Sequence, residues 1–255
     1  MRKKYWFIFY KNLLLLQKKG GQLSIPLAEQ PPVQIDRSFE LLDLKGLSCM
    51  AASMSHVKEE TEEFVQMDLR SSWDVLDEEF YTLASKAFQM LYWDENSQYC
   101  PVCGTKTIQI AVNAKQCPSC KKELYPTIST AILALVRKED SILLVRAHSF
   151  TGSFHGLVAG FLEVGETLEE CVAREVKEET GLTINNITYF DNQFWPYPSG
   201  LMVGFIADYV EGEIILQEEE LSSGAFYTKE NLPELPRKLS LARRMIDWWL
   251  ETQQT

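Results

Sequence analysis

Residues 160–182 constrain this chain more than any other stretch, because they gather acidic side chains on one short predicted helix. Thr167 is placed to cap the N-terminus of that helix with Glu170 as its capping-box partner. Gly181 is placed to end it in a left-handed conformation. Apolar residues recur at helical spacing and predict a buried stripe of Leu168, Cys171, Val172 and Val176. The stretch therefore predicts a helix with one buried face and one acidic face.

The acidic face suits a metal ion. Glu175, Glu178 and Glu179 stand at i, i+3 and i+4, so their carboxylates are close and repel one another unless a cation lies between them. Glu166 in the preceding loop can reach the same cluster, and Arg174 is the cation placed to brace it. Carboxylate oxygens suit Mg²⁺ or Mn²⁺. The plainer alternative is a solvated acidic face on an ordinary amphipathic helix.

This stretch resembles the Nudix box, whose pattern is Gly, five residues, Glu, seven residues, Arg-Glu, an apolar residue, any residue, Glu-Glu, any residue, Gly and an apolar residue. The positions that fill it are Gly160, Glu166, Arg174, Glu175, Val176, Glu178, Glu179, Gly181 and Leu182. The resemblance implies metal-dependent hydrolysis of a nucleoside diphosphate linked to another group. A long motif of this kind favours the Nudix interpretation over the plain acidic helix.

Length and composition are those of an ordinary globular protein. The chain has 255 residues, of which 45% are apolar and 24% charged, so it can bury a sizeable core. A net charge of −11 argues against a general binder of nucleic acid or anionic membranes. No apolar run is long enough to span a bilayer, so we expect no membrane partner.

The N-terminus imitates a signal peptide, with basic residues 2–4 followed by apolar residues 5–10. Lys11 and Asn12 interrupt the apolar run, and no small-residue cleavage site follows closely. We instead predict a β-hairpin that turns at Lys11-Asn12, with Gly20-Gly21 as the next turn. Without a signal peptide, we expect the protein in the cytoplasm, where thiols stay reduced.

Residues 1–95 are predicted to form a small N-terminal α+β domain. Short apolar runs at 23–27 and 39–47, separated by a Pro31-Pro32 break, indicate a small sheet. A helix is indicated by Phe80, Leu83, Ala84, Ala87, Phe88 and Leu91. The domain shows no catalytic pattern, and the chain shows no internal repeat. We expect a structural or dimerisation role here.

Residues 96–126 are predicted to form a zinc ribbon. Two Cys-x-x-Cys knuckles contain Cys100, Cys103, Cys117 and Cys120. Four thiolates suit a tetrahedral Zn²⁺ with no open position, so the site should be structural. The alternatives are two disulfides, which a cytoplasmic location opposes, or a redox motif, which the duplicated knuckle opposes. The remaining Cys49 and Cys171 are predicted to be small buried hydrophobes.

The predicted ribbon carries a basic surface. Lys106, Lys115, Lys121 and Lys122 against Glu123 give a local charge of 4 − 1 = +3. This is either ordinary ribbon surface or a patch that meets a phosphate backbone.

Residues 127–255 form the third predicted domain, which contains the acidic helix. Turn residues at 138–140 separate the first two apolar β runs. The runs are 131–136, 142–145, 157–161, 187–190, 201–210 and 214–215, and a C-terminal helix is predicted at 240–250. The fold class is therefore α+β: a Nudix α/β/α sandwich with a mixed sheet, preceded by the four-Cys zinc ribbon and the N-terminal α+β domain.

A second signature at residues 192–200 bears on substrate. It resembles the Ser-Gln-Pro-Trp-Pro-Phe-Pro-x-Ser motif of the NADH pyrophosphatase family, with Asn192, Phe194 and Gly200 as departures and Tyr197 in place of Phe. Prolines lower the entropy of ordering such a loop, and aromatic faces stack on planar rings. A rigid surface turn with a core Trp is the alternative. The resemblance implies substrate binding by Gln193, Phe194, Trp195, Pro196, Tyr197, Pro198, Ser199 and Gly200.

The resemblance to NADH pyrophosphatases extends over the whole chain, from the N-terminal domain through the ribbon and a Tyr-Pro joint to the Nudix domain. It implies that Tyr125 and Phe161 stack on the substrate and that Arg70 contacts it. Glu220 matches a further metal ligand of the family. Ala159 matches a residue whose backbone contacts the metal, and Ala242 matches one whose backbone contacts the substrate. Gly224 and Phe226 depart from the family near Glu220. A homodimer is also implied.

The expected reaction is hydrolysis of the NAD(H) pyrophosphate to nicotinamide mononucleotide and AMP. Glu175, Glu179 and Glu220 are expected to hold Mg²⁺ or Mn²⁺, with Glu166 in support. Glu178 is expected to be the base that activates water, with Glu175 as the alternative, and Arg174 to orient the carboxylates. Two other functions stay open: removal of an NAD cap from RNA, and a catalytically silent zinc-ribbon protein that binds a nucleotide.

Overall fold

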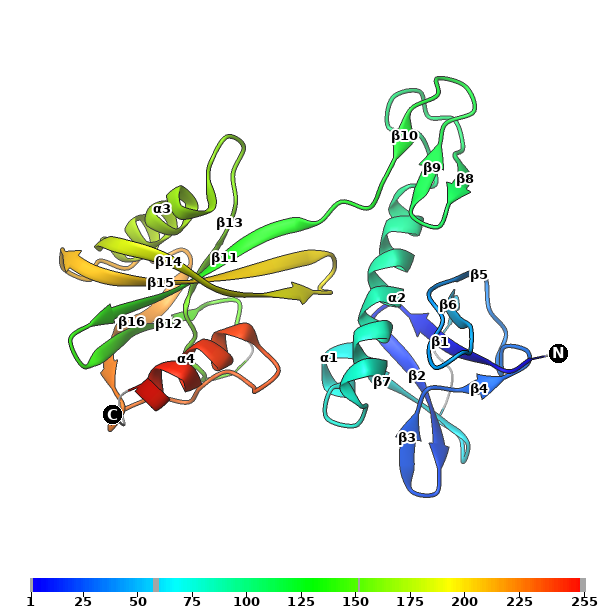
Figure 1. Ribbon diagram of the computed structural model, residues 1–255, viewed down its shortest axis with the longest axis horizontal. Helices are drawn as coiled ribbons and strands as arrows, with labels where there is room; N and C mark the ends of the chain where they lie inside the picture. Colours follow the sequence, from blue (N-terminus) through cyan, green and yellow to red (C-terminus); the bar gives the residue numbers. More distant parts are fainter. Residues whose placement is uncertain (1, 57–59, 151, 253–255) are drawn as a thin grey trace. The chain divides into compact units, whose positions relative to one another are not determined.

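The computed structural model describes residues 2–56, 60–150 and 152–252. The chain forms two compact units (Figure 1). The first unit holds the residues up to Thr127 together with Pro196–Ser199, and the second holds Ile128–Trp195 and the residues from Gly200 onward. The finer division into three domains at residues 95 and 126 stays a prediction.

The second unit is built on a mixed six-stranded sheet in the order β14-β15-β11-β12-β16, with β13 paired to β11. β11 runs parallel to β15 and antiparallel to β12 and β13. Its strands are β11 (Ser129–Lys138), β12 (Ser141–Ala147), β13 (Val158–Phe161), β14 (Thr183–Trp195), β15 (Gly200–Glu211) and β16 (Leu221–Thr228).

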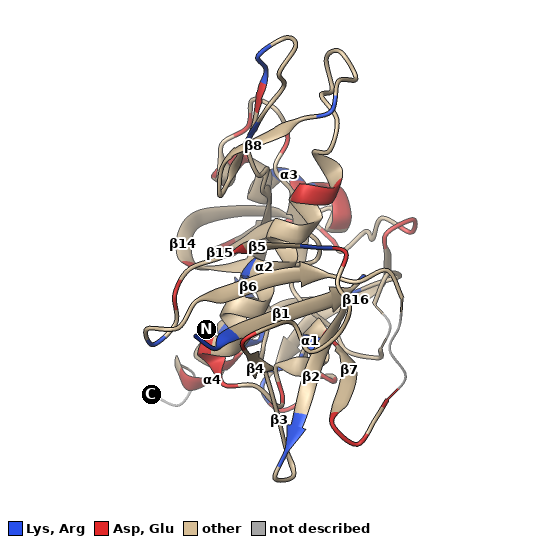
Figure 2. Cartoon of the chain, turned by 90° about the vertical axis from the view of Figure 1, so that its right-hand side faces the viewer, with Lys and Arg blue, Asp and Glu red and all other residues tan. Residues whose placement is uncertain are grey.

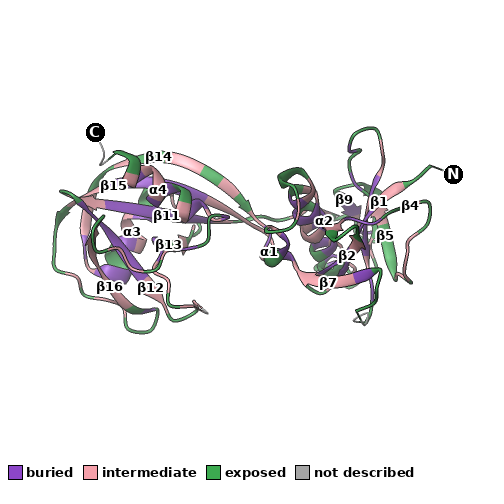
Figure 3. Cartoon of the chain, turned by 90° about the horizontal axis from the view of Figure 1, so that it is seen from below, coloured by how far each residue is buried: buried purple, intermediate pink, exposed green. Residues whose placement is uncertain are grey.

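Two helices cover the two faces of this sheet. α3 (Leu168–Thr180) packs on the face that receives Ile132 and Ala134, and α4 (Leu241–Thr252) packs on the face that receives Leu133 and Leu135. Successive strand residues point to opposite faces, so a strand covered on both sides is apolar without interruption. This explains why β11 is buried over most of its length (Figure 3).

The first unit contains a seven-stranded sheet with α2 (Glu78–Asn96) against one face. The sheet order is β3-β2-β1-β6-β5, with β4 paired to β1 and β7 to β2. Ring contacts of Tyr5 with Phe80 and of Phe9 with Phe88 join β1 to α2. The elements are β1 (Lys4–Tyr10), β2 (Leu13–Lys19), β3 (Gln22–Ser24), β4 (Leu27–Ala28), β5 (Arg37–Glu40), β6 (Cys49–Ser53), β7 (Phe64–Asp68) and α1 (Leu69–Ser72).

The two sheets share one topology, which the sequence did not reveal. β1 pairs antiparallel with β2 and β4 and parallel with β6, as β11 pairs with β12, β13 and β15. β5 and β7 likewise match β14 and β16, and a helix follows in each unit. The expectation of no internal repeat is therefore wrong at the level of topology. The acidic helix has no counterpart, because β4 and β5 are joined by residues 29–36, where Val33 and Ile35 cover the sheet instead.

A small three-stranded sheet carries the four predicted zinc ligands. Its order is β10-β9-β8, with β8 at Ile108–Ala111, β9 at Ala114–Gln116 and β10 at Glu123–Leu124. Lys115 is only 4% exposed and pairs with Asp94 of α2 at 2.6 Å. This ion pair fixes the ribbon to the end of the helix.

Most predicted elements are confirmed. The hairpin turns at Lys11, the helix over Phe80 and Leu91 is α2, and the C-terminal helix is α4. The strand expected at 214–215 is wrong, because Ile215 and Gln217 donate their backbone N–H groups to the end of α3 rather than to a strand. β16 was not anticipated from its Ser- and Gly-rich sequence. Over the described ranges, no helix has the length and hydropathy needed to cross a bilayer.

Candidate active site on helix α3

α3 begins and ends as its sequence predicts. Thr167 Oγ1 accepts from the Glu170 N–H at 3.2 Å, and the Glu170 carboxylate accepts from the Thr167 N–H at 2.8 Å. The capping box is therefore complete. Gly181 closes the helix with φ of 73°. These two signals fix the ends of α3, whose acidic residues are red in Figure 2.

Arg174 joins the acidic residues of the helix to the preceding loop. Its guanidinium donates to Glu175 at 2.9 Å, to Glu178 at 3.0 Å and to both carboxylate oxygens of Glu166. A further bond at 3.1 Å reaches the Phe161 carbonyl oxygen. The hydrogen bonds from Arg174 lower the pKa of Glu166 to about 2. Arg174 thus orients three carboxylates from one position.

Glu179 lies outside this network. Its side chain is buried, with the residue 4% exposed, and no hydrogen-bond donor to its carboxylate occurs among the described residues. Burial, together with the charges of Glu175 and Glu220, raises its pKa to about 8. Burial also raises the pKa of Glu175, against the opposing effect of Arg174. Both shifts reflect burial first and the neighbouring negative charges second.

Glu220 reaches the cluster from the loop before β16. Gln217 N–H donates to the Glu179 carbonyl at 3.0 Å, and Glu220 N–H donates to the Gln217 carbonyl at 3.0 Å. His148 holds the other side, because its N–H donates to the Glu220 carbonyl at 2.9 Å and its ring Nε2 lies 3.0 Å from the Glu218 carbonyl oxygen. Gln217 and His148 were missed from sequence, since neither belongs to a recognisable motif.

The donor types of this cluster suit a divalent cation. A buried carboxylate without a donor, flanked by two further carboxylates, is costly unless a cation neutralises it. Hard oxygen ligands of this kind suit Mg²⁺ or Mn²⁺. The family resemblance implies five metal-binding residues. These are Glu175, Glu179, Glu220 and Glu166 through their side chains, and the exposed Ala159 through its backbone.

The second signature is divided between the units. Gln193 lies in β14, where its side-chain Nε2 donates to the Leu239 carbonyl at 2.8 Å and its Oε1 accepts from the Leu241 N–H at 2.7 Å. Tyr197 belongs to the first unit, where its hydroxyl lies 2.7 Å from that of Tyr81 and its ring lies 4.5 Å from the Arg70 guanidinium. These polar groups have partners within the protein.

The remaining predicted substrate contacts have varied surroundings. Phe161 is 65% exposed, directly after Gly160, and Phe194 is 37% exposed. Trp195 is half-buried beside Gly200, where an added Cβ would lie 3.2 Å from the Trp195 carbonyl oxygen. The rest of this predicted set comprises Pro196 (buried), Pro198 (exposed), Ser199 (bonded to the Thr127 carbonyl), Tyr125 (exposed, bonded to Glu123) and Ala242 in the first turn of α4.

The four ribbon cysteines converge. Their sulfur atoms all lie within 4.8 Å of one another, and Cys103 and Cys117 approach to 3.4 Å. A tetrahedral Zn²⁺ with Zn–S bonds of about 2.3 Å separates its sulfurs by about 3.8 Å, so this cluster has the size of a zinc site. All six cysteines are free of disulfides, and Cys49 and Cys171 are buried as expected.

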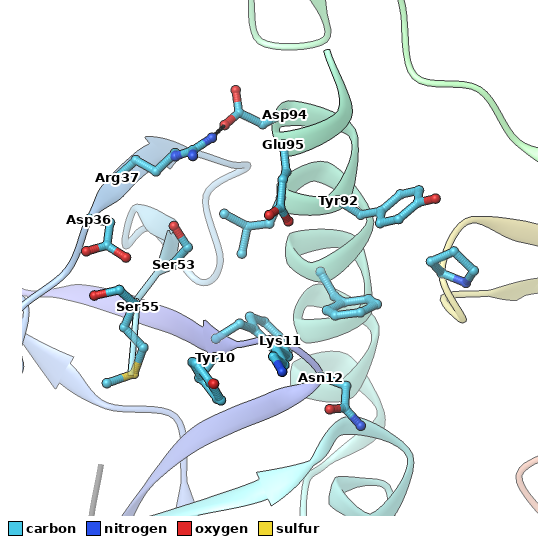
Figure 4. Close-up of a pocket in the computed structure, with 15 residues that line it drawn as sticks. Tyr10, Lys11, Asn12, Asp36, Arg37, Ser53, Ser55, Tyr92, Asp94 and Glu95 are labelled. Atoms are coloured by element: carbon cyan, nitrogen blue, oxygen red, sulfur yellow. Dashed lines mark hydrogen bonds and ion pairs between the residues drawn. The ribbon is translucent and has the colours of Figure 1, made fainter. Parts of the chain in front are cut away.

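The first unit also has a groove of about 690 Å³ at one end of its sheet (Figure 4). Aromatic rings of Phe9, Tyr10, Phe88 and Tyr92 line it, and the ion pair of Arg37 with Asp94 closes one side. None of its lining residues belongs to α3 or to the ribbon cysteines. The groove and the acidic site therefore share no residues.

Comparison with family models gives two matches. Residues 126–249 match the NUDIX domain, and residues 3–93 match the NADH pyrophosphatase-like rudimentary NUDIX domain. The second match agrees with the shared topology of the two sheets and with the missing helix in the first.

Curated relatives carry the name NAD-capped RNA hydrolase NudC. The chain is 39% identical to that of Pseudomonas aeruginosa over 67% of this chain and 62% of the relative. It is 38% identical to that of Klebsiella pneumoniae over 71% of each chain. The match to the Haemophilus influenzae protein is 38% identical over 82% of this chain and 84% of that one. The alignment thus spans under two thirds of the Pseudomonas relative.

Among solved structures, a NUDIX hydrolase from Nitrosomonas europaea superposes with a TM-score of 0.53 at 20% identity. The alignment covers 62% of this chain and 93% of that one. At this identity the likeness concerns the fold alone.

Proposed function

This chain belongs to the Nudix hydrolase family and carries the family's NADH pyrophosphatase-like N-terminal domain, and we propose that it hydrolyses the pyrophosphate of NAD(H) to nicotinamide mononucleotide and AMP. The observation that carries the proposal is the buried Glu179 carboxylate, which has no donor among the described residues and lies within reach of the charges of Glu175 and Glu220. Such a group calls for a bound cation.

The carboxylates of Glu175, Glu179 and Glu220 would hold Mg²⁺ or Mn²⁺, with Glu166 and the Ala159 backbone in support. A bound divalent ion supplies charge neutralisation of the pyrophosphate oxygens and a position for water. Arg174 keeps Glu166, Glu175 and Glu178 in fixed orientations through its hydrogen bonds. The acidic helix is thereby organised before substrate arrives.

Glu178 is the better candidate for the general base. Both carboxylates accept a hydrogen bond from Arg174, but the side chain of Glu178 is 56% exposed whereas that of Glu175 is 12% exposed. Glu178 can therefore meet a water molecule that approaches from solvent. It takes the proton as the water oxygen bonds to phosphorus and the anhydride bond to the leaving phosphate breaks.

Recognition of the dinucleotide falls to aromatic faces and to backbone groups. Phe161 follows Gly160 directly and is exposed, so its ring is available for stacking on a base. Tyr125 and the 193–200 stretch complete the proposed substrate set, with Arg70 holding Tyr197. In α4, the Ala242 N–H supplies a donor to substrate.

Removal of an NAD cap from RNA is the second candidate, favoured by the name of the curated relatives. The same bond would break and leave a 5′-monophosphate RNA. The ribbon surface that would meet the RNA is less basic than its sequence indicates, because Lys115 is buried against Asp94. Exposed Lys106, Lys121 and Lys122 against Glu123 leave 3 − 1 = +2.

AMP release from NADH with Mn²⁺, with and without a chelator, tests the proposal, and parallel assays on NAD-capped RNA at the same salt rank the two substrates. We expect chelator-sensitive release that Glu178→Gln lowers by about 10² to 10⁴-fold. Absence of release from either substrate at every pH and metal tried would favour a silent nucleotide-binding protein. A cytoplasmic location and a homodimer complete the proposal, and light scattering of the purified chain tests the dimer.

A further inference from the structure

Both polar atoms of the Gln193 side chain are bonded to the backbone that leads into α4. Nε2 donates to the Leu239 carbonyl at 2.8 Å, and Oε1 accepts from the Leu241 N–H at 2.7 Å. These two backbone groups lie on either side of Ser240, so the amide spans the point where the helix begins. These two bonds use one of the two N–H groups of Nε2 and one of the two lone pairs of Oε1.

The first turn of α4 has a specific pattern of satisfied donors. A helix leaves its first N–H groups without partners inside the helix. Gln193 accepts from the Leu241 N–H, and Ser240 Oγ accepts from the Arg243 N–H at 3.2 Å. The Arg244 N–H reaches the Ser240 carbonyl at 3.2 Å. Within the described residues, the Ala242 N–H has no such acceptor, and the residue as a whole is 9% exposed.

The same turn is held against the sheet by packing. A Cβ at Gly204 would lie 2.6 Å from the Met245 sulfur, so β15 and α4 approach as closely as a glycine allows. Met245 is fully buried, and Arg244 pairs with Asp191 of β14 at 2.7 Å. Packing fixes the distance of the helix from the sheet, whereas the Gln193 amide fixes the backbone at its start.

We propose that Gln193 is a positioning residue, which acts on substrate through α4 by holding the first turn so that the Ala242 N–H faces the dinucleotide. This rests on the proposed function, in which Ala242 contacts substrate. It assigns to Gln193 a different role from the direct substrate contact that the second signature implies. The proposal also explains why an amide is needed, since donor and acceptor must be presented together.

Gln193→Met tests this, because it keeps the approximate side-chain volume and removes both hydrogen bonds. In the free protein we expect amide hydrogen exchange of residues 241, 243 and 244 to be at least about tenfold faster than in wild type. For NADH hydrolysis we expect KM to rise about tenfold with kcat within about twofold. Thr188→Val is the matched control, since this exposed β14 side chain bonds to Ile206 and should change neither readout.

Ser240→Ala is the second variant, because it removes the other side-chain acceptor of the same turn, the Ser240 Oγ that accepts from the Arg243 N–H. If both residues act through α4, the double variant should raise KM by less than the product of the two single effects. Gln193→Glu keeps the acceptor for the Leu241 N–H and should show an intermediate exchange rate. This variant decides the matter if Gln193→Met does not fold.

A raised KM with wild-type exchange at residues 241, 243 and 244 would overturn the inference, because it would mean that Gln193 touches substrate directly. Multiplicative effects of Gln193→Met and Ser240→Ala would overturn it as well. Exchange is measured without substrate, so it decides the positioning role even if wild-type protein fails to cleave NADH. That failure alone would reject the proposed function.

Discussion

The carboxylate of Glu175 occupies the space that a side chain at position 160 would need. A Cβ built on Gly160 would lie 1.8 Å from Glu175 Cδ and 2.0 Å from its Oε1. Gly160 has no positive φ, so the glycine is required by this close approach rather than by its backbone conformation. β13 therefore runs directly against the acidic face of α3.

Gly160→Ala should displace Glu175 and disable the site. We expect kcat/KM to fall by at least about 10²-fold, because a small misplacement of a catalytic group costs this much. Gly156→Ala is the matched control, since its nearest neighbour would lie at an ordinary 3.5 Å. Steady-state kinetics and thermal melts of both variants check the expectation, and wild-type activity of Gly160→Ala would contradict it.

Glu178→Gln should lower kcat by about 10² to 10⁴-fold while the fold is retained, because it removes the proposed base. Glu169→Gln, an exposed change in the first turn of the same helix, should leave kcat unchanged. Circular dichroism confirms folding, and titration of Mn²⁺ shows whether metal binding is retained. A Glu178→Gln enzyme with normal turnover would transfer the base assignment to Glu175.

Zinc should be present at one ion per chain, and removal of a ligand should release it. Cys117 is fully buried, so Cys117→Ser should lower zinc content and the melting temperature together. Cys49→Ser, at a buried cysteine outside the cluster, should retain the metal. Elemental analysis of purified protein checks this. Purified wild-type chain with less than about a tenth of an ion would reject the zinc site.

The hydroxyls of Tyr81 and Tyr197 should be energetically coupled. Tyr81→Phe removes the hydrogen bond between the two hydroxyls and should cost about 1 kcal/mol of unfolding free energy. The double variant Tyr81→Phe/Tyr197→Phe removes both hydroxyls and should cost less than the sum of the single changes. Denaturant melts measure the cycle, and strictly additive costs would show that the two hydroxyls do not interact.

The acidic helix was predictable because its signals are local. Thr167, Glu170 and Gly181 mark its ends by spacing alone, and the i, i+3, i+4 carboxylates must share a face. The cysteine cluster was predictable for the same reason, since each knuckle is a short fixed segment. The correct predictions therefore rested mainly on the spacing of residues within one short segment.

Contacts between residues far apart in the chain could not be predicted from the sequence. Nothing near Gln193 indicates that its amide meets Leu239 and Leu241, and nothing near Lys115 indicates that Asp94 buries it. The duplicated topology was hidden for a related reason. A sheet register fixes which strands pair, but many apolar sequences satisfy the same pairing.

Asp94 should make stability depend on pH in the acid range. Burial opposes its ionisation, but the hydrogen bonds from Lys115 and Arg37 outweigh burial and lower its pKa. A carboxyl with a lowered folded-state pKa stabilises the protein above its unfolded pKa, near 4, and that contribution is lost as pH falls through the folded value. Asp94→Asn should therefore cost about 3 kcal/mol at pH 7, because it leaves Lys115 buried and unpaired.

The difference between wild type and Asp94→Asn should shrink below about pH 4, where the wild-type carboxyl takes up its proton. Asp208→Asn is the matched control, because its pair with Arg137 is more exposed and should contribute under about 1 kcal/mol. Urea melts from pH 3 to pH 7 measure both differences. A cost of Asp94→Asn that stays constant over this range would show that the charge of Asp94 does not hold the ribbon to α2.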